Sequence, residues 1–111
     1  MRDDRARLED ILEAIERIEK YAGVEKAVFE RDELIQTWMV HNMQVIGEAA
    51  SQLSEEFRQR HPTVPWRAIA SMRNAIVHAY FRVDLEEVWS AVKNDLPGLR
   101  GLIESVLESE E

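Results

Sequence analysis

The stretch LIQTWMVHNMQVIG, residues 34–47, is the longest run in the chain that is rich in apolar residues and free of charge. Asp32 can act as the N-cap of a helix that includes it, and we predict that this helix spans residues 33–59. A helix that is apolar or neutral on every side is buried on more than one face. In so small a chain, we expect one face to pack inside the bundle and another to contact a second copy. The alternative is the central helix of a monomeric bundle.

Amphipathic patterns on both sides of this stretch predict further helices, and no segment alternates as a β-strand would. The N-terminal pattern predicts a helix over residues 3–21, which ends near Gly23, and residues 24–31 form a short segment with one helical turn. Two prolines make residues 61–65 a loop, and Pro65 suits the first turn of a helix from Trp66 to Val77 or His78.

A last helix is predicted to follow Asp84, which is a good N-cap. Pro97 should kink this helix or restart it, with Asp95 as the cap of the restart. The tail, residues 108–111, is expected to fray. The fold class is therefore all-α: a four- to five-helix up-and-down bundle in a single domain, residues 1–111, which forms a symmetric homodimer.

Composition limits the kinds of function this chain can have. It has 111 residues, no cysteine and a net charge of −8. The absence of cysteine excludes disulfides and thiolate metal sites and fits a reducing cytosol. No signal peptide is visible, and residues 34–47 are too short and too polar to cross a bilayer, so we expect a cytoplasmic protein with no membrane partner. The negative charge argues against broad nonspecific binding to nucleic acids.

Residues 57–83 stand out from this acidic background. They contain no Asp or Glu but five arginines, at positions 58, 60, 67, 73 and 82. A cationic segment inside an acidic protein indicates a local anion site. Any contact with RNA or a nucleotide is expected to be confined to this segment.

Within it, residues 73–80 read RNAIVHAY. On an ideal helix, Arg67, Ser71, Asn74 and His78 share one polar stripe, because they are spaced at 0, +4, +7 and +11. Arg73 lies at the edge of the stripe, while Ile69, Met72, Ile76 and Val77 would face the core. On a continuous helix His78 and Tyr80 would point apart, so Tyr80 can approach His78 only if the helix ends after His78.

These groups suit phosphodiester cleavage without a metal. A histidine can take a proton from a ribose 2′-hydroxyl or give one to the leaving oxygen. An arginine stabilises the charge on the phosphorane oxygens, and an asparagine can orient either partner. One histidine serves one proton-transfer role at a time, so a dimer that brings two His78 residues together would serve both. The alternative is a surface arginine and a histidine that caps a helix C-terminus.

Several motifs resemble the HepT-like toxins of the HEPN superfamily. Arg73-Asn74, His78 and Tyr80 are similar to the family's Arg–four residues–His–x–Tyr signature. Residues 45–50 (VIGEAA) look like its second-helix segment, and residues 61–69 (HPTVPWRAI) look like its approach to the motif. Residues 80–84 and 94–97 are also similar. Many relatives have glycine where this chain has Ser71.

This resemblance implies an all-α homodimer whose Arg73 and His78 cut RNA without metal or other cofactor, supported by Asn74 and Ser71. Arg67, Arg82 and Trp66 are then candidate RNA contacts. It also implies a partner, the MNT-type nucleotidyltransferase antitoxin, which can transfer AMP from ATP to the motif tyrosine, Tyr80. Such an adenylate would place a phosphate beside Arg73.

Two other functions remain open. The chain could be a non-catalytic helical partner that regulates a nucleotidyltransferase and binds nucleotide in its cleft, or a plain dimerisation bundle. No cluster of His, Asp or Glu has convincing metal-ligand spacing. His41 is expected to be buried or at an interface, and His61 to be a loop residue. The tryptophans are expected to be core or interface anchors, with Trp66, next to the arginines, as the one that could stack on a base.

Overall fold

The computed structural model describes residues 3–72, 74 and 83–110, and these residues form helices and connections without a β-strand. The all-α class is therefore confirmed. The elements are α1 (Asp4–Glu19), α2 (Lys26–Arg31), α3 (Glu33–Ser51), α4 (Glu55–Arg60), α5 (Trp66–Ala70), α7 (Leu85–Ser90), a π-helical segment (Ala91–Asp95) and α8 (Leu96–Ser109).

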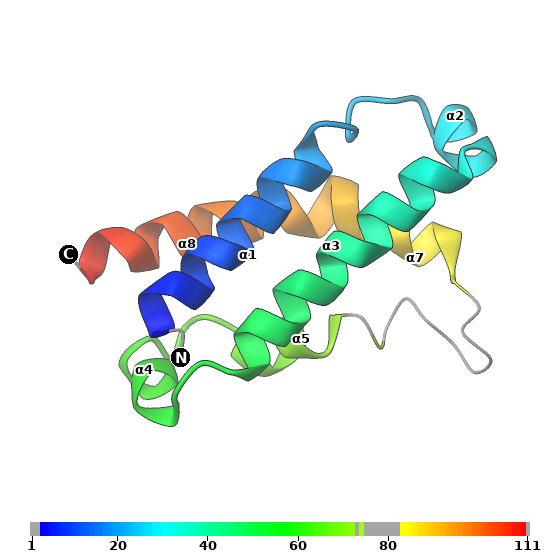
Figure 1. Cartoon of the computed structure of the whole chain (residues 1–111). Helices are drawn as coiled ribbons and strands as arrows, with labels where there is room; N and C mark the ends of the chain where they lie inside the picture. Colours follow the sequence, from blue (N-terminus) through cyan, green and yellow to red (C-terminus); the bar gives the residue numbers. More distant parts are fainter. Residues whose placement is uncertain (1–2, 73, 75–82, 111) are drawn as a thin grey trace.

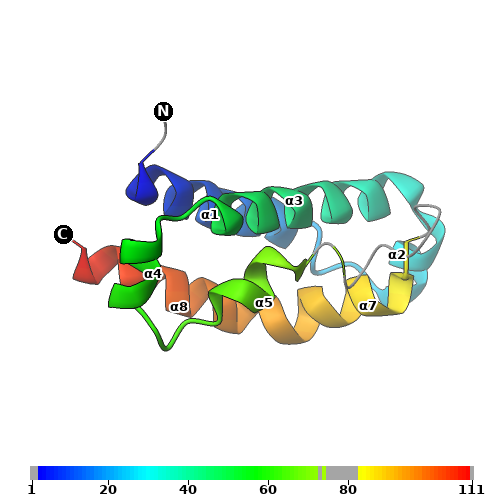
Figure 2. The same cartoon turned by 90° about the horizontal axis from the view of Figure 1, so that it is seen from below.

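The helices pack in two layers (Figures 1 and 2). Helices α1 and α3 lie side by side in one layer, and α5, α7 and α8 form the other. Helix α8 contacts α1, while α5 contacts α3. Both chain ends lie near α4, at the end of the bundle opposite α2. No helix in the described part is both long enough and apolar enough to cross a membrane.

Helix α1 forms as its sequence pattern predicts. The Asp3 carboxylate accepts a hydrogen bond of 2.8 Å from the backbone N–H of Ala6 and so caps the first turn. The apolar side chains recur every three or four residues and are buried against α3 and α8. They are Leu8, Ile11, Ala14, Ile15 and Ile18.

Helix α3 begins as predicted but ends earlier. Asp32 caps it by accepting from the N–H groups of Leu34 and Ile35. We predicted a continuous helix over residues 33–59, but α3 ends at Ser51 and α4 starts at Glu55. The reason is Ser54, whose Oγ accepts from the N–H of Phe57 at 3.1 Å and starts a new helix with two glutamates in its first turn.

Gly47 lets α3 and α5 approach closely. A Cβ atom at this position would lie 3.1 Å from the carbonyl oxygen of Ala70. Such a contact is tighter than ordinary van der Waals packing, so a larger residue would push α5 away. Gly47 therefore sets the position of the last residue of α5, three residues before Arg73.

Near Pro97, where we predict a kink or a restart, the structure has a π-helical segment between α7 and α8. The helical path continues from α7 into α8 through the π-helical segment, in which the N–H of Leu96 donates to the carbonyl of Ala91. Pro97 has no N–H to donate, and the wider π turn accommodates this loss. Asp95 occupies the N-cap position of α8, as predicted, but it has helical backbone angles and its side chain makes no cap hydrogen bond, so the expected side-chain cap is absent.

Candidate functional site

The residues that lead into the RNAIVHAY segment lie as the predicted stripe requires. Arg67, Ser71 and Asn74 are all exposed, whereas Ile69 is buried. Helix α5 ends at Ala70, and Ser71 then makes a turn in which its N–H donates to the carbonyl of Arg67 at 3.0 Å. The N–H of Asn74 in turn donates to Ser71 at 2.9 Å. Pro65 is the N-cap residue of α5, one position before the predicted first turn.

Four of the predicted site residues lie outside the described residues: Arg73, His78, Tyr80 and Arg82. Their assignments as catalytic pair, modification site and RNA contact stay predictions. The predicted continuous helix from Trp66 to Val77 or His78 is wrong at its first part, because α5 ends at Ala70 and Ser71 makes a turn; the rest of the predicted helix, from residue 75 on, lies outside the described residues.

The arginines of residues 57–83 are not equivalent. Arg67 is exposed and has no ion-pair partner among the described residues, so its charge is available to a ligand. Arg60, in contrast, is paired with Glu110 at 3.0 Å and with Glu56 at 3.4 Å. Arg67 is therefore the better candidate for a phosphate contact.

Trp66 belongs to the core. Its side chain is only 6% exposed, it packs against Phe57, and its Nε1–H donates to the carbonyl of His61 at 3.0 Å. A ring that is covered on its faces offers no platform to a base. Trp66 is therefore a core anchor, as we expect of the tryptophans in general. Its burial gives no support to the prediction that it stacks on an RNA base.

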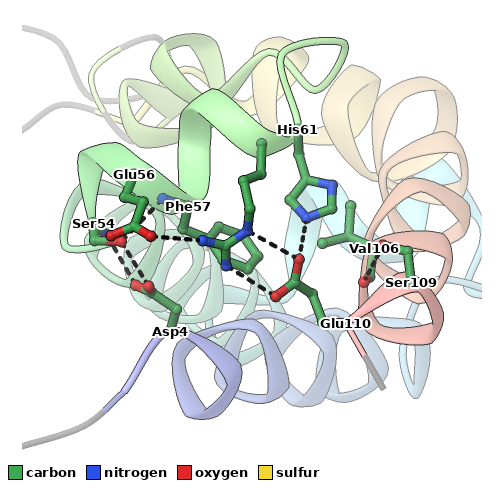
Figure 3. A network of polar contacts seen from close by, with 9 residues as sticks. Asp4, Ser54, Glu56, Phe57, His61, Val106, Ser109 and Glu110 are labelled. Atoms are coloured by element: carbon green, nitrogen blue, oxygen red, sulfur yellow. Dashed lines mark hydrogen bonds and ion pairs between the residues drawn. The ribbon is translucent and has the colours of Figure 1, made fainter.

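His61 is more than a loop residue, and the tail is not frayed at Glu110 (Figure 3). The His61 Nε2 atom lies 2.7 Å from Glu110 Oε2, and its ring packs on Phe57 with centroids 4.9 Å apart. Hydrogen bonds from Arg60, and then from His61, hold the pKa of Glu110 below its ordinary value. These contacts join the end of α8 to the loop that leads into α5. Sequence reasoning missed them because the partners are 49 residues apart.

A groove runs over the exposed face of α3. We call it the α3 groove; its volume is about 580 Å³, and its polar lining comprises Arg7, Asp10, His41, Gln44, Glu48, Ser51 and Asn74. His41, expected to be buried or at an interface, is exposed in the single chain. The groove extends from α3 to Asn74, the second residue of the RNAIVHAY segment.

Within the described residues, no group of three or more His, Asp or Glu side chains could hold a metal ion. The polar groups that the α3 groove brings together are the Arg7 guanidinium, two carboxylates, two side-chain amides and an imidazole, and such groups bind ligands by hydrogen bonds and charge. Fold and site thus define a small helical bundle with a polar groove between α3 and the end of α5, and with the exposed Arg67 on α5 itself.

The chain belongs to the HepT-like ribonuclease family, because the family model "Ribonuclease HepT-like" matches residues 11–106. The resemblance that the motifs indicated is thereby confirmed. The chain is 40% identical to "Probable ribonuclease HepT" of Thermococcus cleftensis over 102 residues, which cover 89% of this chain and 91% of that protein. It is 34% identical to a protein of Caldanaerobacter subterraneus subsp. tengcongensis named "Putative RNase", over the full length of both.

A third relative is longer. The chain is 35% identical to a protein of Methanocaldococcus jannaschii named "Gamma-glutamylcyclotransferase and putative RNase", and the match covers 96% of this chain and 49% of that protein. No solved structure matches the chain significantly.

Proposed function

We propose that this protein is a metal-independent endoribonuclease and the toxin of a HEPN/MNT toxin–antitoxin pair. The observation that carries the proposal is the family match over residues 11–106, which includes the whole RNAIVHAY segment. The exposed Arg67, Ser71 and Asn74 support it, since they present hydrogen-bonding groups beside that segment.

In the proposed reaction, a ribose 2′-oxygen attacks the neighbouring phosphorus and the bond to the 5′-oxygen breaks. His78 of one protomer takes the proton from the 2′-hydroxyl, and a second His78 gives a proton to the leaving 5′-oxygen. Arg73 stabilises the negative charge on the phosphorane oxygens, and Asn74 and Ser71 orient the groups. The products are a 2′,3′-cyclic phosphate and a free 5′-hydroxyl.

The proposal includes a homodimer, because one chain supplies a single motif histidine. The exposed side of the uncharged half of α3 is the surface we assign to the contact. Leu34 is 83% exposed there, and Thr37, one turn further on, is exposed as well. Two copies joined along α3 would bury this surface.

The antitoxin in this proposal is a nucleotidyltransferase that adds AMP to Tyr80. The hydroxyl oxygen of Tyr80 attacks the α-phosphorus of ATP, pyrophosphate leaves, and the tyrosine proton is released. The added phosphate would compete with RNA for Arg73 and so block cleavage.

The proposal is tested with the purified chain and RNA of random sequence in EDTA. We expect cleavage that leaves 2′,3′-cyclic phosphate ends and that falls by about 10² or more in Arg73→Ala and in His78→Ala. Arg31→Ala, a change of an exposed arginine at the end of α2, is the matched control and should keep full activity. Cleavage that needs added magnesium, or that survives His78→Ala, would exclude this mechanism. If the chain cuts no RNA but binds nucleotide, the regulatory-partner alternative replaces it.

A further inference from the structure

The exposed side of α3 has a projecting side chain at one end and the α3 groove at the other. The exposed residues recur every three or four positions and so lie on one side of the helix. They are Leu34, Thr37, His41, Gln44 and Glu48. Leu34 is 83% exposed, more than any other large apolar side chain in the described part of the chain. The groove, at the C-terminal half of α3, has apolar or small residues in its lining, namely Val45, Gly47, Ala49 and Ala70. One surface thus carries both a projecting leucine and a groove that can receive it.

The charges along α3 indicate where a second copy would lie on this surface. Residues 34–47 contain no Asp, Glu, Lys or Arg, and Glu33 and Glu48 bound them on either side. A contact centred on this run leaves both carboxylates at its edge, where water still solvates them. A shift along the helix would bury one of them without a partner. The middle of the run falls between Val40 and His41, so in a centred symmetric pair His41 lies beside the two-fold axis.

The direction of the second copy follows from symmetry and charge. In a parallel pair every residue faces its own counterpart. Glu48 would then face Glu48, and the two grooves would face each other and leave unfilled space. In an antiparallel pair centred on the run, residues equally far from the middle face each other, so Leu34 lies opposite Gly47 and Glu48. The leucine of each copy then fills the groove of the other, and Arg7 in the groove offers a positive charge to the partner's Glu33.

From this complementarity we infer that two copies pack antiparallel along α3, and that Leu34 of each copy occupies the α3 groove of the other. This inference rests on the homodimer of the proposed function and adds its geometry. The groove of about 580 Å³ has room for a leucine side chain and its neighbours. Ala70 and Asn74 line it together with α3, so the leucine of one copy packs beside the end of α5 in the other.

Cysteine cross-linking tests this arrangement, because the chain contains no cysteine of its own. Single variants are made at four exposed positions of α3: Leu34→Cys, Thr37→Cys, Gln44→Cys and Glu48→Cys. With a short bis-maleimide, a mixture of Leu34→Cys and Glu48→Cys should form a covalent dimer, and so should a mixture of Thr37→Cys and Gln44→Cys. Leu34→Cys alone should not, because the two copies of this position lie about 21 Å apart along the helices.

The matched control is Leu102→Cys, an exposed position on α8 in the other layer. At micromolar concentration, each expected mixture should cross-link roughly a hundredfold or more faster than either member does with Leu102→Cys, since a dimer holds its paired thiols at a millimolar effective concentration. Light scattering on the wild type and an RNA cleavage assay are run beside the cross-linking.

The outcomes separate this inference from the proposed function. If Leu34→Cys and Glu48→Cys each cross-link to themselves and not to each other, the copies run parallel, and the inference is overturned while the homodimer stands. If the wild type is a dimer but no mixture cross-links faster than the control, another surface forms the dimer and the inference is wrong. If the wild type is a monomer, the inference and the proposed homodimer both fail. If the mixtures cross-link as expected but the protein cuts no RNA, the contact stands and the nuclease is wrong.

Discussion

The imidazole Nε2 of His61 lies 2.7 Å from Oε2 of Glu110, and this contact ties the last turn of α8 to the loop that precedes α5. Arg60 donates to the same carboxylate, and in Figure 3 the Glu110 side chain points into the space between α4 and α8. The helix that leads to the motif is therefore held by a residue near the C-terminal end of the chain.

This contact predicts an acid-sensitive stability. The pKa of Glu110 is below its ordinary value of 4.5 in the folded protein, because of Arg60 first and His61 second. A carboxyl group whose pKa is lower when folded contributes stability above its unfolded pKa, and the contribution disappears as the pH falls through the folded pKa. Glu110→Gln should therefore lower the Tm at pH 7, and the difference from wild type should vanish at low pH.

Thermal melts at a series of pH values measure this effect. Glu108→Gln is the control, since Glu108 is exposed on the same helix and has no ion-pair partner among the described residues. A Tm difference for Glu110→Gln that stays constant down to the acid limit would mean that the ion pair does not stabilise the fold.

Gly47→Ala should destabilise the protein and slow RNA cleavage. The added methyl would press on the Ala70 carbonyl 3.1 Å away, and overpacking of this kind costs about 1–3 kcal/mol, which outweighs the gain of about 0.5–1 kcal/mol from alanine in a helix. Gly101→Ala on α8 meets nothing within 4 Å, so it should stabilise the protein by that smaller amount. Urea unfolding gives the free energy of unfolding of both variants. If both substitutions stabilise the protein equally, α5 moves away from the added methyl group without cost.

We expect a homodimer at micromolar concentration, and Leu34→Glu should weaken it. A charge at this 83% exposed position would have to be buried without a partner in the contact between copies. Leu102→Glu is the control, because Leu102 is an exposed leucine on α8, in the other layer. Light scattering distinguishes the dimer from the 12.9 kDa monomer. A wild-type monomer would remove the shared cleft and, with it, the two-histidine mechanism.

Tyr80 should be the site of AMP transfer. Incubation with the cognate nucleotidyltransferase and ATP should raise the protein mass by whole AMP units and stop cleavage. Tyr80→Phe should prevent the mass gain and leave cleavage largely intact, because the phenol transfers no proton in the mechanism. Tyr21→Phe removes the only other tyrosine, which is 42% exposed, and should leave the modification unchanged. Continued modification of Tyr80→Phe would place the switch elsewhere.

The local signals of the sequence were reliable where one residue type decides the geometry. Asp32 and Asp84 cap helices as predicted, and the apolar positions of α1 are buried. The errors arose where two local signals competed. The apolar pattern continues through Leu53 and Phe57, yet the cap at Ser54 divides it, and Pro97 is accommodated by a π-helical segment without a side-chain cap.

Long-range contacts could not be read from local patterns at all. Nothing near Glu110 in the sequence indicates that it bonds to His61, 49 residues earlier. The exposure of Arg67, Ser71 and Asn74 was predictable, because helical spacing alone places them on one stripe. The α3 groove was not, since it needs α1, α3 and the end of α5 together.

The positions of the two chain ends allow the chain to be circularly permuted. Asp4 accepts hydrogen bonds from the N–H and Oγ–H of Ser54, and Glu110 meets His61, so both ends are anchored on the same short segment around α4. A peptide linker between the ends would therefore bridge neighbouring parts of the molecule, and new termini could be opened at the exposed Gly23. Such a circular permutant would keep the contacts around α4 and would place its free ends, or a fluorescent label, at the far end of the bundle from them.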